Sequence, residues 1–199
     1  MRLMILAALL TLSSPFLGQA PTPSLQLNFT ASAESFSAAT QEYRDIWARE
    51  GSRIVAAMER ATGLRFEPGP IEVSIYEGTS YSGERGGRPM VLRASYEDET
   101  KRGTLVHELG HRLAADVPFK GDHHELIFLF VYDVWVDLWG KEFADGQVRI
   151  EGLRKGLVDY DGIWKRTLAM PAEERARRLK EIVGQRRVPW TPGAMSSRY

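Results

Sequence analysis

The 199-residue chain contains no cysteine, which excludes disulfide bonds, a lipid-modified cysteine and any thiolate metal site. An excess of charge of one sign is also missing, because 26 acidic residues balance 26 basic ones. The net charge therefore favours neither a nucleic acid nor an anionic membrane as a partner of the whole chain. Histidine is scarce, with four in the chain. A zinc site would have to use these histidines together with carboxylates.

No hydrophobic run is long enough to span a bilayer, but a short one stands at the N-terminus. Arg2 precedes an apolar run over residues 3–12, and residues 18–20 (Gly-Gln-Ala) offer small side chains for cleavage. This pattern is typical of a secretory signal peptide, with an uncleaved anchor as the alternative. We therefore predict a signal peptide over residues 1–20. The mature protein is expected to be exported, periplasmic or secreted, without stable membrane insertion.

Residues 21–199 are predicted to form a single domain, of α+β class and mainly helical. Alternation of apolar and polar residues predicts strands over 25–29, 71–76 and 90–94. Helical spacing and capping signals predict helices over 33–62, 95–115, 123–139, 141–155, 159–169 and 171–183. The glycine-rich residues 78–89 are expected to form either a flap near a cleft or a floppy hairpin. Residues 184–199 are expected to be a loosely ordered tail.

The most informative motif is His107-Glu108-Leu109-Gly110-His111. On a helix, positions i and i+4 share a face, so the two imidazoles point the same way. Two neutral imidazoles at that spacing can hold one Zn²⁺, and the glutamate between them can take a proton from a water at the metal. The motif therefore predicts two zinc ligands, His107 and His111, and a general base, Glu108.

A catalytic zinc site needs a third protein ligand, and the next predicted helix begins with two more histidines. His124 is the predicted third ligand, because it shares a helix face with apolar residues and would be buried without a partner. The alternatives are Glu125 and His123, followed by the more remote carboxylates Asp133, Glu142 and Glu151. The cofactor expected from this set is Zn²⁺.

Two further roles follow from residue type and spacing. Asp133 and Asp137 stand i, i+4 on an apolar helix, so one of them is a candidate to accept the outer N–H of a ligand histidine. An ion pair with a basic residue of a neighbouring helix is the alternative. A tetrahedral oxyanion also needs a donor. Tyr160 is the main candidate for that donor, and the others are Tyr132, Tyr96 and Arg154.

The motif resembles that of the zincin metallopeptidases, and the order strand–helix–helix over residues 71–139 is loosely similar to theirs. The resemblance implies that His107 and His111 bind zinc and that Glu108 is the general base. It also implies a small twisted mixed or antiparallel sheet, followed by the active-site helix and a helical C-terminal part. The edge strand of that sheet, here residues 90–94, would pair with an extended peptide substrate.

The chain departs from the larger zincin groups. A metzincin has glycine three residues after the second histidine and a third histidine three residues further, where this chain has Ala114 and Val117. Gluzincins place a glutamate about twenty residues downstream, where this chain has Phe130 and Val131. The chain therefore resembles a small zincin that is not a metzincin, gluzincin-like with a short spacer to the third ligand.

These observations predict an exported zinc-dependent peptidase or amidohydrolase that cleaves peptide or cell-wall peptide bonds in a peptide or protein substrate. One alternative is a periplasmic zincin-fold protein that binds zinc or a partner without peptidase activity. Glu108 argues against that alternative, since a binding site has no need of a base. The other alternative is a chance motif that binds no metal. The sequence leaves the substrate and the oligomeric state open.

Overall fold

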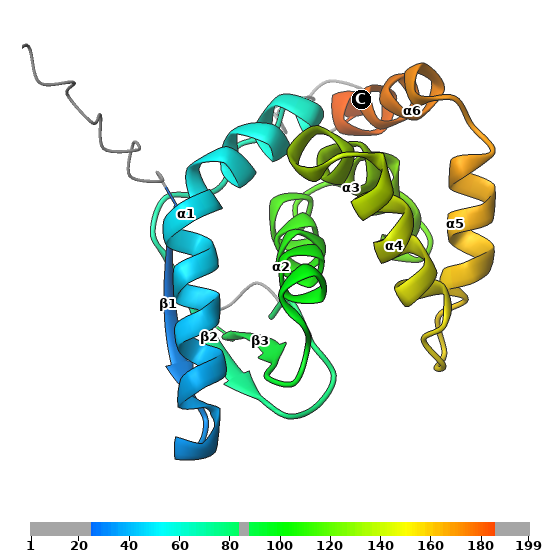
Figure 1. Ribbon diagram of the computed structural model, residues 1–199. Coiled ribbons are helices and arrows are strands. Elements are labelled where there is room, and N and C mark those ends of the chain that lie inside the picture. Colours follow the sequence, from blue (N-terminus) through cyan, green and yellow to red (C-terminus); the bar gives the residue numbers. More distant parts are fainter. Residues whose placement is uncertain (1–24, 84–87, 186–199) are drawn as a thin grey trace, which may run out of the picture.

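The computed structural model describes residues 25–83 and 88–185, and in these residues a small sheet is followed by a helical array (Figure 1). The predicted signal peptide and residues 186–199 of the predicted tail lie outside the described residues. The strands are β1 (Gln26–Ala31), β2 (Pro70–Tyr76) and β3 (Met90–Arg93). The helices are α1 (Ser37–Thr62), α2 (Asp98–Leu113), α3 (His123–Trp139), α4 (Lys141–Gly152), α5 (Tyr160–Leu168) and α6 (Ala172–Gly184), with a short 3-10 turn η1 (Glu34–Phe36) before α1.

The sheet is parallel, so the expectation of a mixed or antiparallel sheet is wrong. Its strand order is β1-β2-β3, and both strand pairs run parallel. The reason lies in the connection between β1 and β2, which is the 26-residue helix α1. A strand, a helix and a neighbouring strand form a crossover unit, and such a unit returns the chain in the same direction.

The outer edge of β3 is covered by the chain itself. Residues 77–89 connect β2 to β3, and Tyr81 in this connection forms an antiparallel bridge with Val91. The bridge has both hydrogen bonds, Tyr81 N to Val91 O at 2.9 Å and Val91 N to Tyr81 O at 2.8 Å. Arg93 N also donates to Ser80 Oγ at 3.1 Å. The edge that was expected to receive a peptide substrate is therefore already paired.

Helix α3 is the centre of the helical array. It contacts the five other helices, α1, α2, α4, α5 and α6. Its residues Ile127, Phe128, Val131 and Trp135 are fully buried. This burial explains the all-round apolar sequence of α3, which a helix with one solvated face would not have. No helix in the described ranges is long and apolar enough to cross a membrane.

Helix α2 lies between the sheet and α3, which places the motif at the junction of the two parts (Figure 1). Gly110 makes the close contact with α3 possible. A Cβ atom at this position would lie 3.1 Å from Val131 Cγ2, closer than ordinary van der Waals contact. The glycine of the motif therefore lets α2 pack closely against the middle of α3.

Candidate metal centre

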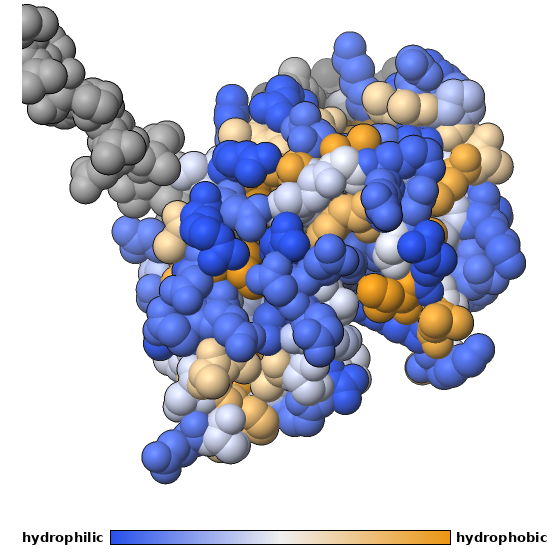
Figure 2. All heavy atoms as spheres, viewed as in Figure 1, coloured by the Kyte–Doolittle hydropathy of each residue, from blue (hydrophilic) through white to orange (hydrophobic). Residues whose placement is uncertain are grey.

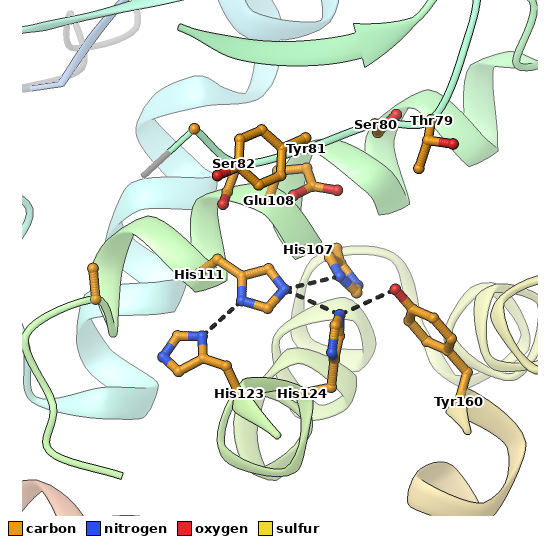
Figure 3. Close-up of a pocket in the computed structure, with 12 residues that line it drawn as sticks. Thr79, Ser80, Tyr81, Ser82, His107, Glu108, His111, His123, His124 and Tyr160 are labelled. Carbon is orange, nitrogen blue, oxygen red and sulfur yellow. Dashed lines mark hydrogen bonds between the residues drawn. The ribbon is translucent and has the colours of Figure 1, made fainter. Parts of the chain in front are cut away.

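Helix α2 carries His107, Glu108 and His111 on the face that meets α3 and the pocket (Figure 3). His107 is 1 % exposed and Glu108 is 4 % exposed. Helix α3 begins at His123, and its N-cap Asp122 accepts a hydrogen bond from His124 N at 2.9 Å. This cap fixes the first turn of α3 and directs the His124 ring toward the two α2 histidines.

Three ring nitrogens converge between the two helices. His111 Nε2 lies 3.2 Å from His107 Nε2 and 3.3 Å from His124 Nε2. One ligand atom from each of these histidines lies within 4.8 Å of the others, so the three could together hold a metal ion. His124, the third ligand favoured by the sequence, is thus the residue that completes the cluster.

In each of the three histidines, Nδ1 is the ring nitrogen that points away from the common centre, and it faces a partner. These partners determine which ring nitrogen carries the proton. His107 Nδ1 lies 2.7 Å from Glu151 Oε1, an ion-pair contact rather than a well-aligned hydrogen bond. His124 Nδ1 lies 2.6 Å from Asp122 Oδ1. A carboxylate beside Nδ1 favours the proton on that atom. The lone pair is then left on Nε2, which faces the common centre.

His111 reaches the same tautomer through a different partner. Its Nδ1 lies 2.7 Å from Nδ1 of His123, whose Nε2 in turn lies 3.4 Å from the carbonyl oxygen of Ala114. A carbonyl can only accept, so His123 carries its proton on Nε2 and accepts on Nδ1. His111 therefore donates through Nδ1 and, like His107 and His124, keeps its Nε2 lone pair free.

Two of the three distances between these nitrogens are compatible with tetrahedral coordination of a metal ion. Zinc–nitrogen bonds of about 2.0–2.1 Å in a tetrahedral arrangement separate neighbouring nitrogens by about 3.3–3.4 Å. The observed 3.2 Å and 3.3 Å between the Nε2 atoms are close to this value. Three histidines are also a ligand set typical of catalytic zinc sites.

The electrostatics of the cluster favour neutral rings at two of the three positions. Burial lowers the pKa of His111 far below its ordinary value, and neighbouring histidines lower it further. Burial and His107 also lower the pKa of His124. Burial opposes a charge on His107 as well, but the Glu151 carboxylate offsets this and raises the His107 pKa. A metal would therefore compete with a proton mainly at His107.

Glu151 belongs to a buried network that reaches α5. Trp164 Nε1 donates to Glu151 Oε2 at 2.9 Å, and Arg154 lies 3.9 Å from Glu151 Oε1. The Trp164 ring stacks on Phe128 of α3 with 3.6 Å between ring centroids. The carboxylate behind His107 is thus held by three elements, α3, α4 and α5.

A pocket of about 660 Å³ opens above the histidines (Figure 3). Glu108 lines it, and burial raises the pKa of this carboxyl above its ordinary value. Tyr160, at the start of α5, also lines it, and its hydroxyl oxygen lies 3.1 Å from His124 Nε2. Of the four oxyanion candidates, Tyr160 is the one that lines this pocket. Arg154 packs over its ring, 5.5 Å from the centroid.

The opposite wall of the pocket is the extended segment 79–83, which we call the hydroxyl wall because it contains Thr79, Ser80, Tyr81 and Ser82. Arg112, the residue after His111, donates to Ser82 O at 2.5 Å and to Arg88 O at 2.7 Å. Gly83 has φ +66, and a Cβ there would lie 2.5 Å from the Arg112 guanidinium. The glycine-rich connection thus reaches the pocket at residues 79–83, and residues 84–87 lie outside the described ranges.

The other predicted ligands have different positions. His123 contacts His111 from outside the cluster, and Glu125 pairs with Arg166 at 3.5 Å. Of the two roles considered for Asp133 and Asp137, the ion pair with a neighbouring helix is confirmed, and neither residue orients a ligand histidine. Asp133 accepts two hydrogen bonds from Arg175, and Asp137 pairs with Arg60 at 2.6 Å, because α3 turns these positions toward α6 and α1 rather than α2.

Two residues that hold the cluster in place were missed or given another role. Asp122 carried a usable signal, since aspartate directly before a helix is a common N-cap. Glu151 was considered only as a remote ligand, and nothing in its local sequence indicates contact with His107 on another helix. Comparisons with known proteins find no match among protein-family models, curated proteins or solved structures.

Proposed function

We propose that this protein is a zinc-dependent metallopeptidase that hydrolyses peptide bonds, with Glu108 as the general base. The observation that carries the proposal is the convergence of three Nε2 lone pairs beside a buried carboxylate at the floor of a pocket. With the predicted signal peptide, the reaction would take place outside the cytoplasm.

His107, His111 and His124 are the residues that would hold the ion. Imidazole nitrogen suits zinc, copper, iron and nickel, and three histidines with an open position are the ligand set typical of catalytic zinc. A bound zinc ion supplies Lewis acidity, which polarises a carbonyl and lowers the pKa of a coordinated water. Glu151, Asp122 and His123 fix the ring orientations, because each faces the outer nitrogen of one ligand histidine.

Glu108 is placed to hold and move a proton. It stands between the two motif histidines in sequence and lines the same pocket as all three histidines. Burial raises its pKa, which makes the carboxylate a stronger base than an exposed glutamate. It would take a proton from the attacking water and deliver that proton to the leaving amine.

The Tyr160 hydroxyl is placed to donate a hydrogen bond to the oxygen of the scissile carbonyl. It lies beside His124 Nε2 and therefore beside the position where the carbonyl would be polarised. Burial raises the pKa of the Tyr160 phenol, so it remains a donor at neutral pH. The Arg154 guanidinium packs over the Tyr160 ring, 5.5 Å from its centroid.

The substrate backbone would lie along the hydroxyl wall. Tyr81 uses its N–H and carbonyl for the bridge to Val91. In an extended segment, the polar groups of the flanking residues point to the other side. Ser80 therefore offers backbone groups on the side away from β3, and an extended peptide could pair there, whereas Ser82 O already accepts from Arg112. The substrate strand would then lie one segment outward from β3.

The proposal is tested by metal analysis and by hydrolysis of a denatured protein, using chain purified without a histidine tag. We expect about one zinc per chain and measurable cleavage. Glu108→Gln should keep the zinc and lose about 10²–10⁴-fold in kcat. Glu125→Gln is the matched control, since Glu125 lies next to His124 in sequence but pairs with Arg166 outside the cluster.

Each other outcome contradicts a defined part of the proposal. Wild-type protein without zinc would overturn the metal centre. Full activity of Glu108→Gln would overturn the role of Glu108. Zinc bound at full occupancy without hydrolysis of any peptide would instead support a zinc-binding protein without peptidase activity.

A further inference from the structure

Exposed large hydrophobic side chains are concentrated in one place among the described residues. Three of the four such side chains belong to the end of α4 and the connection to α5: Ile150 is 39 %, Leu153 74 % and Leu157 108 % exposed. We call residues 150–158 the α4–α5 tip. It projects from the edge of the molecule in Figure 1, and Figure 2 shows hydrophobic next to hydrophilic residues at that edge.

The exposed charged residues around the tip are the cations Arg149 and Lys155 and the anions Asp159 and Asp161. Lys155 stands between the two exposed leucines, and Arg149 precedes them; both are exposed. The carboxylates of the same stretch are engaged. Glu151 is buried behind His107, Asp159 accepts from Gly162 N at 2.9 Å, and Asp161 pairs with Lys165 at 2.6 Å. The tip therefore offers apolar side chains with Lys155 between them, while Asp161 is balanced by Lys165 and Asp159 keeps its charge at the start of α5.

This combination fits a lipid surface better than a protein partner. Three aliphatic side chains on a projecting connection cannot supply the roughly 800 Å² that each partner buries in a standard protein interface. Exposed leucines can enter the headgroup boundary of a bilayer singly, and lysine or arginine beside them is attracted by anionic lipids. The zero net charge of the whole chain does not oppose this, because the attraction acts over about one Debye length.

We propose that the α4–α5 tip docks this protein peripherally on an anionic lipid surface, with Leu153 and Leu157 inserted and Lys155 at the headgroups. The tip also lies next to the metal centre. Arg154 contacts both Glu151, near the end of α4, and the ring of Tyr160, at the start of α5. Both of these residues belong to the site. Docking would therefore hold the pocket close to the lipid surface.

The experiment is sedimentation of the full chain with phosphatidylcholine vesicles, with and without phosphatidylserine. Every variant carries the same N-terminus, so differences between variants report on the tip. Leu153→Ser/Leu157→Ser should lower the partition coefficient about tenfold or more, because two exposed leucines lose their apolar contact with lipid. Lys155→Glu should lower binding about fivefold or more on the vesicles with phosphatidylserine. It should leave binding to phosphatidylcholine alone unchanged.

Lys180→Glu on the exposed face of α6 is the matched charge control and should bind like wild type. Three results would overturn the proposal. The first is equal binding of wild type and the double leucine variant. The second is failure of the wild type to bind phosphatidylserine vesicles. The third is a dimer in sedimentation velocity that the double variant abolishes, which would assign the tip to a second copy of the chain. No readout depends on metal or peptidase activity.

Discussion

The two walls of the pocket are built in opposite ways. The helical wall, formed by α2, α3 and the start of α5, holds each histidine with a second residue behind it and buries His107 and Glu108 almost completely. The hydroxyl wall is a single extended segment, joined to β3 by one bridge and the hydrogen bond from Arg93 N to Ser80 Oγ, and to α2 by Arg112. Under the proposed function, the helical wall would fix the chemistry, and the hydroxyl wall would determine how a substrate backbone is presented.

If this division is correct, changes behind the helical wall should alter metal affinity, and the largest effect is expected at Glu151. Glu151→Gln keeps the size of the side chain and an acceptor for Trp164, but it removes the charge beside His107 Nδ1. We expect zinc to bind about 10–100-fold more weakly, the usual cost of losing such an outer partner. Competition with a chromophoric chelator measures the change.

Glu142→Gln is the control for this prediction, because Glu142 is an exposed glutamate on the same helix. It should bind zinc like wild type. Unchanged affinity in Glu151→Gln would show that His107 does not need a carboxylate behind it. The contact between Glu151 and His107 would then have no effect on zinc affinity.

A smaller effect is expected at His123, the one outer partner that is neutral. His123→Ala removes the acceptor for His111 Nδ1 and should weaken zinc binding about tenfold, at the lower end of the usual range for such partners. His123→Asn should recover part of the affinity, because the amide oxygen can occupy the position of Nδ1. Isothermal titration measures all three proteins.

The contrast between alanine and asparagine decides the role of His123. If both variants lose affinity equally, the His123 ring contributes packing rather than a hydrogen bond. If alanine loses none, His111 keeps its tautomer without a partner, and the chain of contacts from His111 to Ala114 has no part in metal binding.

Local signals predicted most of the helices and the metal cluster, whereas contacts between distant segments were mispredicted. The helix 123–139 agrees with α3 at both ends, and His107, His111 and His124 could be named because their spacing lies on two successive helices. The strand–helix–strand order over the first two strands also indicates a parallel pair, whereas the resemblance to the zincins implies a mixed or antiparallel sheet.

Asp133 and Asp137 show why the remainder could not be read from the sequence. Their spacing predicts that they share a helix face, and the sequence does not specify which neighbour covers it. Helix α3 contacts five helices, so each of its faces meets a different partner. For Glu151, the difficulty is the distance along the chain to its partner. Its partner His107 is 44 positions away, and only the packing of α4 on α2 and α3 brings them together.

The smallest effect is expected on the hydroxyl wall, at Arg112. Its guanidinium donates to Ser82 O and Arg88 O, and these bonds attach two points of the connection between β2 and β3 to α2. Arg112→Gln removes the bonds but leaves the Tyr81–Val91 bridge, so the wall should loosen without detaching. We expect KM for a peptide to rise about three- to tenfold, with kcat and zinc content within about twofold of wild type, because binding weakens equally for the ground and transition states. Arg102→Gln is the matched control, since Arg102 is on the same helix but pairs with Asp98 and lies over Trp139. A fall in kcat or in zinc content with KM unchanged would mean that Arg112 acts through its neighbour His111, and the two walls would then not be separable.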